Sequence, residues 1–360
     1  MRQNKLFLVC LCLFILPLPA YTQCICDFSK VASTTLPAVV TIISPTPPPA
    51  SQQYNIPWLK EKETIGAGFI IDPAGLIVTS YHTIKNSDHF FVGLWDGRKI
   101  KGEVKAVDPS TDVALVYIET PTPLPTVTWS DDKNLKIGES VLVAGNPFGL
   151  GASVSTGVIS ALGRELSDPE IGLNPAHQIP GFIQTDAAIS LGHSGGPMLN
   201  AQGKVIGMIT VIVSPSAGSI GLGFATPACV VKNIVSLLGK YGSIPRIELG
   251  IDLEDPDLDP APATTTSLRL ERPQHGAKVT RVSKTGLGSV SGLQEGDIIL
   301  KIDAHPIDSP SDVPYRLTSL CDKENITFVV WRDGSIHHLP MNLGPAESRQ
   351  PLSKNETLVT

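Results

Sequence analysis

The sequence predicts a mostly β protein with two domains. The chain has 360 residues, of which 42% are apolar and 17% charged, and this size and composition are typical of a globular protein with two domains. Short β-branched segments recur between Gly, Pro, Asn and Asp turns, a pattern typical of an all-β barrel or sandwich. The strands expected in the first domain lie at residues 38–43, 68–71, 76–79, 90–94, 113–118, 141–144 and 205–213.

The strand pattern stops at one helix and then starts again. Apolar residues recur on one face at helical spacing over residues 227–241, which predicts a helix that closes the first domain. We expect the second domain at residues 246–345, after a proline-rich surface loop at 45–63 in the first domain and before a flexible tail at 346–360. The strands expected in the second domain lie near residues 249–253, 277–282, 298–302 and 326–331.

Residues 1–23 have the features of a signal peptide. Arg2 and Lys5 give a cationic start, and an apolar run of about fourteen residues follows. A bilayer-spanning helix needs about twenty apolar residues, so we expect cleavage near Ala20, with retention as an N-terminal anchor as the alternative. The protein is therefore expected to be exported, with a mature first domain at residues 24–245.

Charge and cysteine content argue against nucleic-acid and metal binding. The formal net charge is -6, and the sequence contains no basic stripe of the kind that nucleic acid requires. Cys24 and Cys26 stand close together, but a structural zinc site needs four ligands. We expect no metal, no cofactor and no nucleic-acid partner.

The strongest local pattern surrounds Ser194. Glycines on both sides allow this serine to sit on a tight turn, where the backbone of Gly192, His193 and Ser194 can form an oxyanion hole. A nucleophilic serine needs a base, and His82 follows the strand expected at 76–79, while Asp112 opens the strand expected at 113–118. Each residue alone is more often structural, but their order His, Asp, Ser predicts a proton-transfer triad.

The same serine motif also fits the nucleophile elbow of an α/β-hydrolase. That fold requires a helix directly after the serine and then an Asp and a His downstream in the same domain. Here Pro197 follows at once, a strand is expected at 205–213, and the next histidine is His275 in the second domain. We therefore prefer the triad of His82, Asp112 and Ser194.

With these motifs the chain resembles the HtrA (Deg) family of trypsin-like serine proteases. The resemblance covers residues 66–71, 79–82, 112–115, 143–151, 156–160, 182–189 and the Ser194 loop. It implies a chymotrypsin-like double β-barrel followed by a single PDZ domain, and a homotrimer. It also implies endoproteolysis of unfolded or misfolded proteins in the periplasm or cell envelope, without ATP, metal or cofactor.

The residues expected at the specificity pocket are apolar or small. Ala188 stands six residues before Ser194, where enzymes that cleave after Lys or Arg carry a carboxylate. The expected walls of the pocket are Ile209, Thr210, Val211 and Ile220, so we expect cleavage after small or medium aliphatic residues.

Four residues depart from or extend the family pattern in the first domain. His193 replaces the usual Asn, so its larger ring favours a flipped loop, and its side chain should point away from substrate. Ser80 and Tyr81 replace two asparagines. Arg164 matches the family arginine that senses the PDZ domain or a neighbouring subunit, with a solvated surface arginine as the alternative.

The second domain resembles a PDZ domain. Its carboxylate-binding loop is expected at Glu248, Leu249, Gly250 and Ile251, and its groove helix at 311–320, so that it binds C-terminal apolar peptides. Two alternatives stay open from the sequence alone. One is a chaperone-like or catalytically slow peptide-binding protein, and the other is a membrane-tethered signalling protease with one dedicated substrate.

Overall fold

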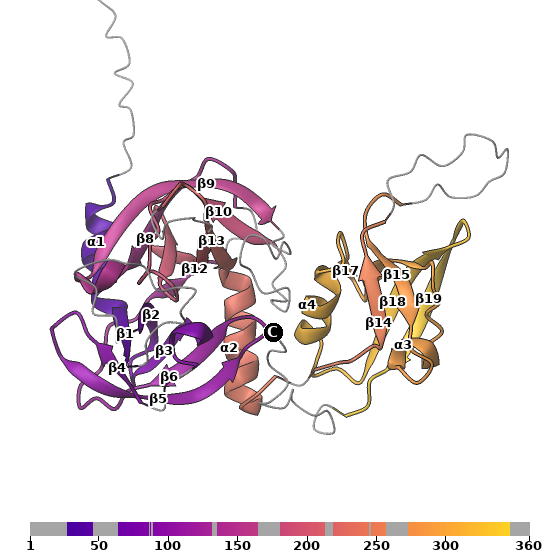
Figure 1. Ribbon diagram of the computed structural model, residues 1–360, viewed down its shortest axis with the longest axis horizontal. Coiled ribbons are helices and arrows are strands. Elements are labelled where there is room, and N and C mark those ends of the chain that lie inside the picture. The colour runs from indigo at the N-terminus through magenta and orange to yellow at the C-terminus, as the bar shows by residue number, and fades with distance from the viewer. Residues whose placement is uncertain are drawn as a thin grey trace, which may run out of the picture.

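The computed structural model describes residues 27–45, 64–85, 87, 89–131, 135–164, 181–212, 219–244, 246–256 and 273–345. Two β-barrels pack together, and a third sheet lies beside them (Figure 1). The predicted leader, the proline-rich loop from residue 46 onward, the tail, Cys24 and Cys26 lie outside the described residues. Among the described residues, no helix combines the length and the apolar character needed to cross a bilayer.

The first barrel is closed in the strand order β1-β2-β3-β6-β5-β4. Its interior holds fully buried side chains such as Ile42, Ile77 and Phe90. Antiparallel pairing of β3 with β6 brings Ser80 opposite Val113, so the residues that follow β3 meet those that precede β6. The strands are β1 (Val39–Ser44), β2 (Thr64–Asp72), β3 (Leu76–Ser80), β4 (Phe90–Gly93), β5 (Lys99–Asp108) and β6 (Val113–Tyr117).

The second barrel contains six strands in the order β11-β8-β9-β10-β13-β12, closed by pairing of β11 with β12, and β7 adds to β12 in parallel. Its core includes Val143, Ile183 and Ile209. The strands are β7 (Thr128–Trp129), β8 (Ser140–Gly145), β9 (Ser153–Arg164), β10 (Phe182–Thr185), β11 (Pro197–Asn200), β12 (Lys204–Ile212) and β13 (Gly223–Pro227).

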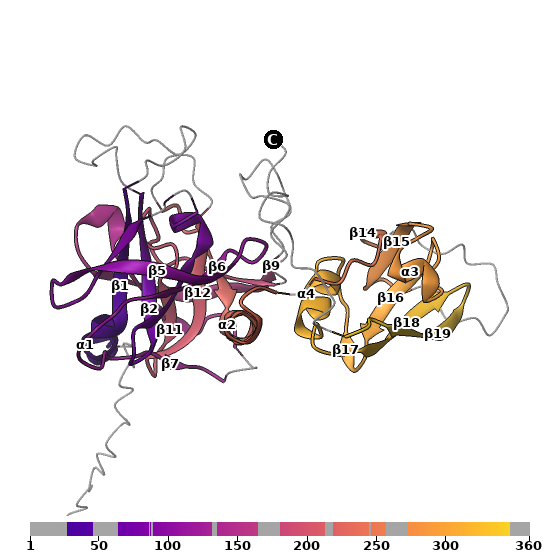
Figure 2. The same cartoon turned by 90° about the horizontal axis from the view of Figure 1, so that it is seen from below.

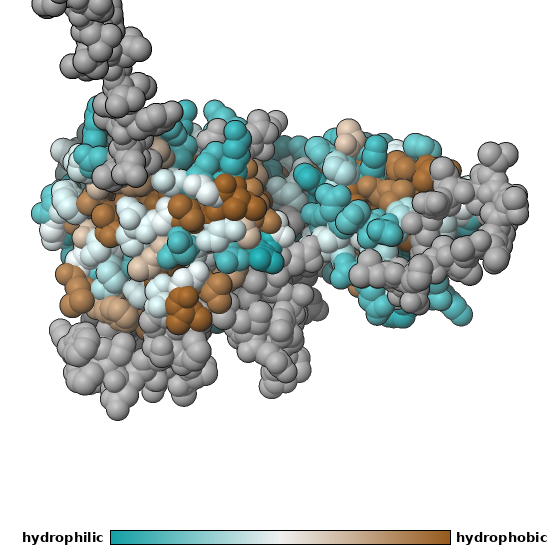
Figure 3. Space-filling model, turned by 90° about the horizontal axis from the view of Figure 1, so that it is seen from above, coloured by the Kyte–Doolittle hydropathy of each residue, from teal (hydrophilic) through white to brown (hydrophobic). Residues whose placement is uncertain are grey.

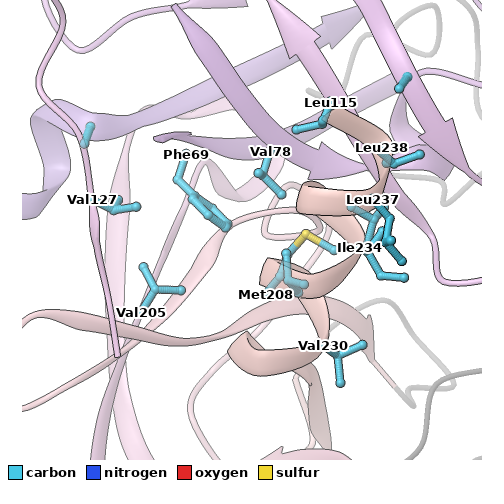
Figure 4. Packing of buried hydrophobic residues seen from close by; sticks show 14 of the residues in the cluster. Phe69, Val78, Leu115, Val127, Val205, Met208, Val230, Ile234, Leu237 and Leu238 are labelled. Carbon is cyan, nitrogen blue, oxygen red and sulfur yellow. The ribbon is translucent and has the colours of Figure 1, made fainter. Parts of the chain in front are cut away.

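A large apolar cluster joins the two barrels to helix α2 (Ala228–Tyr241). Figure 4 shows Phe69 and Val78 from the first barrel and Met208 from the second beside Ile234 of the helix. All four side chains are fully buried, and burying one side chain of this kind stabilises a fold by about 1.5–3 kcal/mol. The helix predicted at 227–241 is confirmed, whereas α1 (Ser29–Thr35) was not predicted.

The C-terminal sheet, which we define as β14 to β19, has its own core. Strand β14 forms its edge in the order β14-β15-β16-β18-β19, and β17 pairs with β16. Val313 and Leu317 of helix α4 pack into this core with Phe328. Its elements are β14 (Ile251–Glu254), β15 (Ala277–Val282), α3 (Leu287–Val290), β16 (Ile298–Ile302), β17 (His305–Pro306), α4 (Asp312–Ser319), β18 (Asn325–Arg332) and β19 (Ser335–Asn342).

Helix α4 lies on the side of the C-terminal sheet that faces α2 (Figures 1 and 2). Arg246, which precedes β14, forms an ion pair with Asp108 at the end of β5 and donates a 2.6 Å hydrogen bond to the hydroxyl of Thr318 in α4. We call Arg246, Asp108 and Thr318 the linker clasp. Cys321, two residues after the end of α4, belongs to the apolar cluster around α2. The linker clasp and this cluster therefore join the C-terminal sheet to the barrels.

The exposed surface mixes polar and apolar residues. On the face shown in Figure 3, brown apolar residues lie between teal and white ones over the barrels, and another group lies on the C-terminal sheet. Large apolar side chains that are exposed include Trp95, Leu150, Ile220 and Val290.

Candidate active site

His82 and Asp112 form the central contact of the site. His82 lies in a short 3-10 helix, Tyr81–Thr83, directly after β3, and Asp112 directly precedes β6. The Nδ1 atom of His82 lies 2.7 Å from Oδ2 of Asp112, while the His82 backbone amide donates to Oδ1 at 2.8 Å. Both carboxylate oxygens therefore hold the histidine, one through its ring and one through its main chain.

The turn before β6 orients the Asp112 carboxylate towards His82. Asp112 has a φ of 55°, a left-handed conformation that Asp tolerates better than most residues, and its carbonyl accepts a 2.9 Å bond from the Tyr81 amide. Thr111 donates a 2.6 Å hydrogen bond to Asp108, which closes the same turn. The Asp112 side chain is only 2% exposed, while that of His82 is 37% exposed. The carboxylate is thus shielded, and the imidazole reaches solvent.

The environment of His82 favours a protonated ring. Burial alone would lower the pKa of His82, but the negative charge of Asp112 and the hydrogen bond to it outweigh burial, so the pKa is raised above its usual 6.5. A base held in this way accepts a proton readily near neutral pH.

The Ser194 turn packs directly against the strands that lead to His82. The Ser194 carbonyl accepts a 2.8 Å bond from the amide of Ala67 in β2. The carbonyl of Ala67 accepts a 2.6 Å bond from the hydroxyl of Thr79 in β3, three residues before His82. The loop of the second barrel that carries Ser194 therefore lies against the part of the first barrel that carries His82 and Asp112.

Neighbouring hydrogen bonds orient the two amides expected to bind an oxyanion. In a trans peptide unit the C=O and N–H groups point in opposite directions. The Leu191 carbonyl accepts a 2.9 Å hydrogen bond from the Phe148 amide, so the Gly192 N–H of the same peptide unit points away from Phe148. The His193 carbonyl accepts a 2.8 Å hydrogen bond from the Gly196 amide, so the Ser194 N–H points away from Gly196. Among the described residues, neither N–H has an acceptor. The flipped loop that the size of His193 led us to expect is therefore not the arrangement observed.

Gly192 makes this arrangement possible. Its φ is 99°, and a Cβ atom at this position would lie 2.1 Å from the carbonyl oxygen of Asn146. No side chain fits here without moving the turn that holds both amides.

Comparisons with known proteins agree with this site. A trypsin-like peptidase domain is matched over residues 66–208. The chain is 36% identical over 287 residues to the periplasmic serine endoprotease DegP of Escherichia coli (strain K12), a match that covers 79% of this chain and 58% of that protein. It is 34% identical over 297 residues to a probable periplasmic serine endoprotease DegP-like protein of Halomonas elongata, covering 82% and 59% respectively. A solved structure, the HtrA-type protease AlgW with tripeptide, superimposes with a TM-score of 0.71 at 30% identity and covers 88% of this chain and 97% of that one.

The chain belongs to the HtrA family of trypsin-like serine proteases. Its mostly β, chymotrypsin-like double-barrel fold, predicted from the sequence, is confirmed. This HtrA chain spans 58–59% of the length of the two curated relatives named above.

The structure places the predicted pocket residues of this HtrA chain in different environments. Ala188 and Ile220 are exposed, whereas Ile209 packs in the core of the second barrel. The hydroxyl of Thr210 is buried and lies 2.7 Å from that of Thr226. The side chain of Val211 lies outside the described residues. The pocket stays a prediction.

The predicted regulatory and peptide-binding residues lie outside the triad. Arg164 ends β9, is exposed, and donates a 3.1 Å hydrogen bond to the side chain of Gln184. Residues 165–180 of the loop that follows lie outside the described residues. At the start of the C-terminal sheet, Glu248 and Gly250 are exposed, Leu249 is buried, and Ile251 opens the edge strand β14.

Sequence reasoning missed Asn146 as a positioning residue. Its amide nitrogen donates to the Thr41 hydroxyl at 2.8 Å, its side-chain oxygen accepts from the Gly151 amide at 2.7 Å, and its backbone amide donates to the Gly192 carbonyl at 3.1 Å. Asn146 thus joins the first barrel to the oxyanion turn. The available signal was an Asn and a Pro just after the strand predicted at 141–144, which indicates a turn but not its partners.

Proposed function

We propose that this chain is a serine endopeptidase in which His82, Asp112 and Ser194 form the catalytic triad. The observation that carries the proposal is the 2.7 Å contact of the His82 ring with a buried carboxylate, beside a serine turn whose amides are oriented by their neighbours. Ser194 attacks the scissile carbonyl, and His82 takes its proton and returns it to the leaving amine. Asp112 holds the tautomer of the imidazole, and the amides of Gly192 and Ser194 stabilise the oxyanion.

The substrates we propose are unfolded or misfolded polypeptides of the cell envelope, cleaved after small or medium aliphatic residues. An apolar Ala188 in place of a carboxylate supports this preference. Both curated relatives named above are periplasmic by name, which supports the location, and the family resemblance supports a homotrimer.

We further propose that the C-terminal sheet is a PDZ domain that binds apolar C-terminal peptides and regulates cleavage, with Arg164 in the sensing path. Strand β14 lies at the sheet edge, where a bound peptide can add as a further strand. The loop at Glu248 to Ile251 leads directly into that strand, which supports its role as the site for the peptide carboxylate.

Casein digestion by the purified chain, with and without an apolar peptide, tests this function. We expect fragments that end in Val, Ala or Ile, and complete inhibition by a fluorophosphonate that labels Ser194. Mass spectrometry identifies both the cleaved bonds and the labelled residue. Binding of casein without cleavage or labelling would instead support the chaperone-like alternative, and cleavage after Lys or Arg would overturn the proposed pocket.

The pH dependence of cleavage should report the raised pKa of His82. Only neutral His82 can accept the serine proton, so kcat/KM should fall as the pH drops through the pKa of His82 in the free enzyme. Because this pKa is raised, the midpoint of the acid limb should lie above 6.5. Initial rates with a small peptide substrate in buffers of constant ionic strength measure the midpoint, and a value of 6.5 or lower would contradict the assigned environment.

A further inference from the structure

We propose that the His193 side chain is a positioning residue that locks the oxyanion turn through Ser190 and Gly145, and that its imidazole is neutral when it does so. This inference rests on the proposed function and adds a residue to it.

The His193 ring closes the turn that contains Gly192. Its Nδ1 atom lies 3.2 Å from the backbone nitrogen of Ser190, 3.1 Å from the Ser190 carbonyl oxygen and 3.4 Å from the Ser190 hydroxyl. The His193 amide donates to the same carbonyl at 3.1 Å. Side chain and main chain of one residue therefore both hold Ser190, and the two oxyanion amides belong to this segment.

The ring is seated against the end of β8. A Cβ atom on Gly145 would lie 2.9 Å from both Cα and Cδ2 of His193, so the absence of a side chain at 145 makes room for the imidazole. The residue after Gly145, Asn146, holds the Gly192 carbonyl. His193 thus fixes the turn on one side, and the main chain after β8 fixes it on the other.

The surroundings of the ring do not accommodate a positive charge. His193 is 4% exposed, and its contacts with Gly145, Ser190 and Gly196 bring no titratable side chain to the ring. Burial lowers the pKa of His193, and the hydrogen bond with Ser190 opposes this only in part. A protonated Nδ1 atom loses the hydrogen bond from the Ser190 amide and can only donate to the Ser190 carbonyl. Protonation therefore exchanges one contact for another and places a charge without a counter-charge on a buried ring, which destabilises the turn.

Two variants and a matched control test the proposal. In His193→Ala, kcat/KM should fall at least about tenfold through kcat, with little change in KM, because the loss of an oxyanion donor costs about 10²–10³-fold in kcat and a loosened turn costs a part of this. His193→Asn should restore most of the activity. His305→Asn removes an exposed histidine of the C-terminal sheet and should change neither parameter.

The pH profile separates positioning from general stability. In the wild type, log kcat/KM should decline with a slope of about one as His82 protonates and then steepen towards about two as His193 protonates at lower pH. His193→Asn should retain the single slope, while near-ultraviolet circular dichroism verifies that both proteins stay folded. If the profile of His193→Asn still steepens at low pH as the wild-type profile does, or if His193→Ala keeps the wild-type kcat, the inference is overturned. If His193→Ala does not fold, the slope of His193→Asn decides. A wild type that neither cleaves nor labels overturns the proposed function and this inference with it.

Discussion

Substitution of Asp112 by asparagine should lower kcat by about 10⁴-fold. The carboxylate accepts the Nδ1 proton of His82 at 2.7 Å, which leaves Nε2 free to accept a proton from Ser194. An asparagine can keep the bond from the His82 amide through its oxygen, but its NH₂ group would then donate to Nδ1 and select the wrong tautomer. Steady-state kinetics with a peptide substrate measure the loss.

The same variant should also move the acid limb of the pH profile. Without the charge of Asp112, burial dominates the pKa of His82, so residual activity should persist to lower pH than in the wild type. Ser194→Ala supplies the background rate for these assays. Activity of Asp112→Asn within about tenfold of wild type would show that this carboxylate does not hold the reacting histidine.

Substitution of Arg246 by methionine should lower the free energy of unfolding by about 3–5 kcal/mol. The Arg246 side chain is 10% exposed and that of Asp108 is 5% exposed, so the change leaves a buried carboxylate without its guanidinium. Methionine has a similar length, so lost packing is a minor part of the effect. Urea unfolding in a Ser194→Ala background avoids self-digestion and measures the difference.

Two further variants show whether the effect belongs to the linker clasp. Asp108→Asn combined with Arg246→Met removes both charges and should recover much of the lost stability. Arg98→Met breaks an ion pair with Asp96 in which both side chains are exposed, and it should cost no more than about 1 kcal/mol. Equal losses of unfolding free energy in Arg98→Met and Arg246→Met would mean that burial of the linker clasp adds nothing to stability.

The sequence predicts those features that local patterns determine. Helical spacing identified α2, and the ordered motifs around His82, Asp112 and Ser194 identified residues that the strand pairing brings together. Strand β19 was missed because histidines and a proline interrupt its pattern. The linker clasp was missed because Arg246 and Asp108 are 138 residues apart and no local pattern relates them.

The predicted pocket residues show a second limit of prediction from the sequence. Strand β12 is covered on both sides, since Val205 and Met208 face the α2 cluster and Ile206 and Ile209 face the barrel core. Such a strand reads as a continuous apolar run, so the sequence cannot tell which face a residue takes. This is why Ile209 was expected at a pocket surface and lies in the interior instead.

Helix α4 contributes to two apolar interiors, and this affects how the protein can be divided. Val313 and Leu317 fill the C-terminal sheet, while Tyr315 and the adjoining Cys321 cover part of the cluster around α2. A shortened chain that stops before Arg246 would leave apolar side chains on α2 in contact with water. Such a fragment would tend to self-associate, so a loss of its activity would be no measure of what the missing residues do for catalysis.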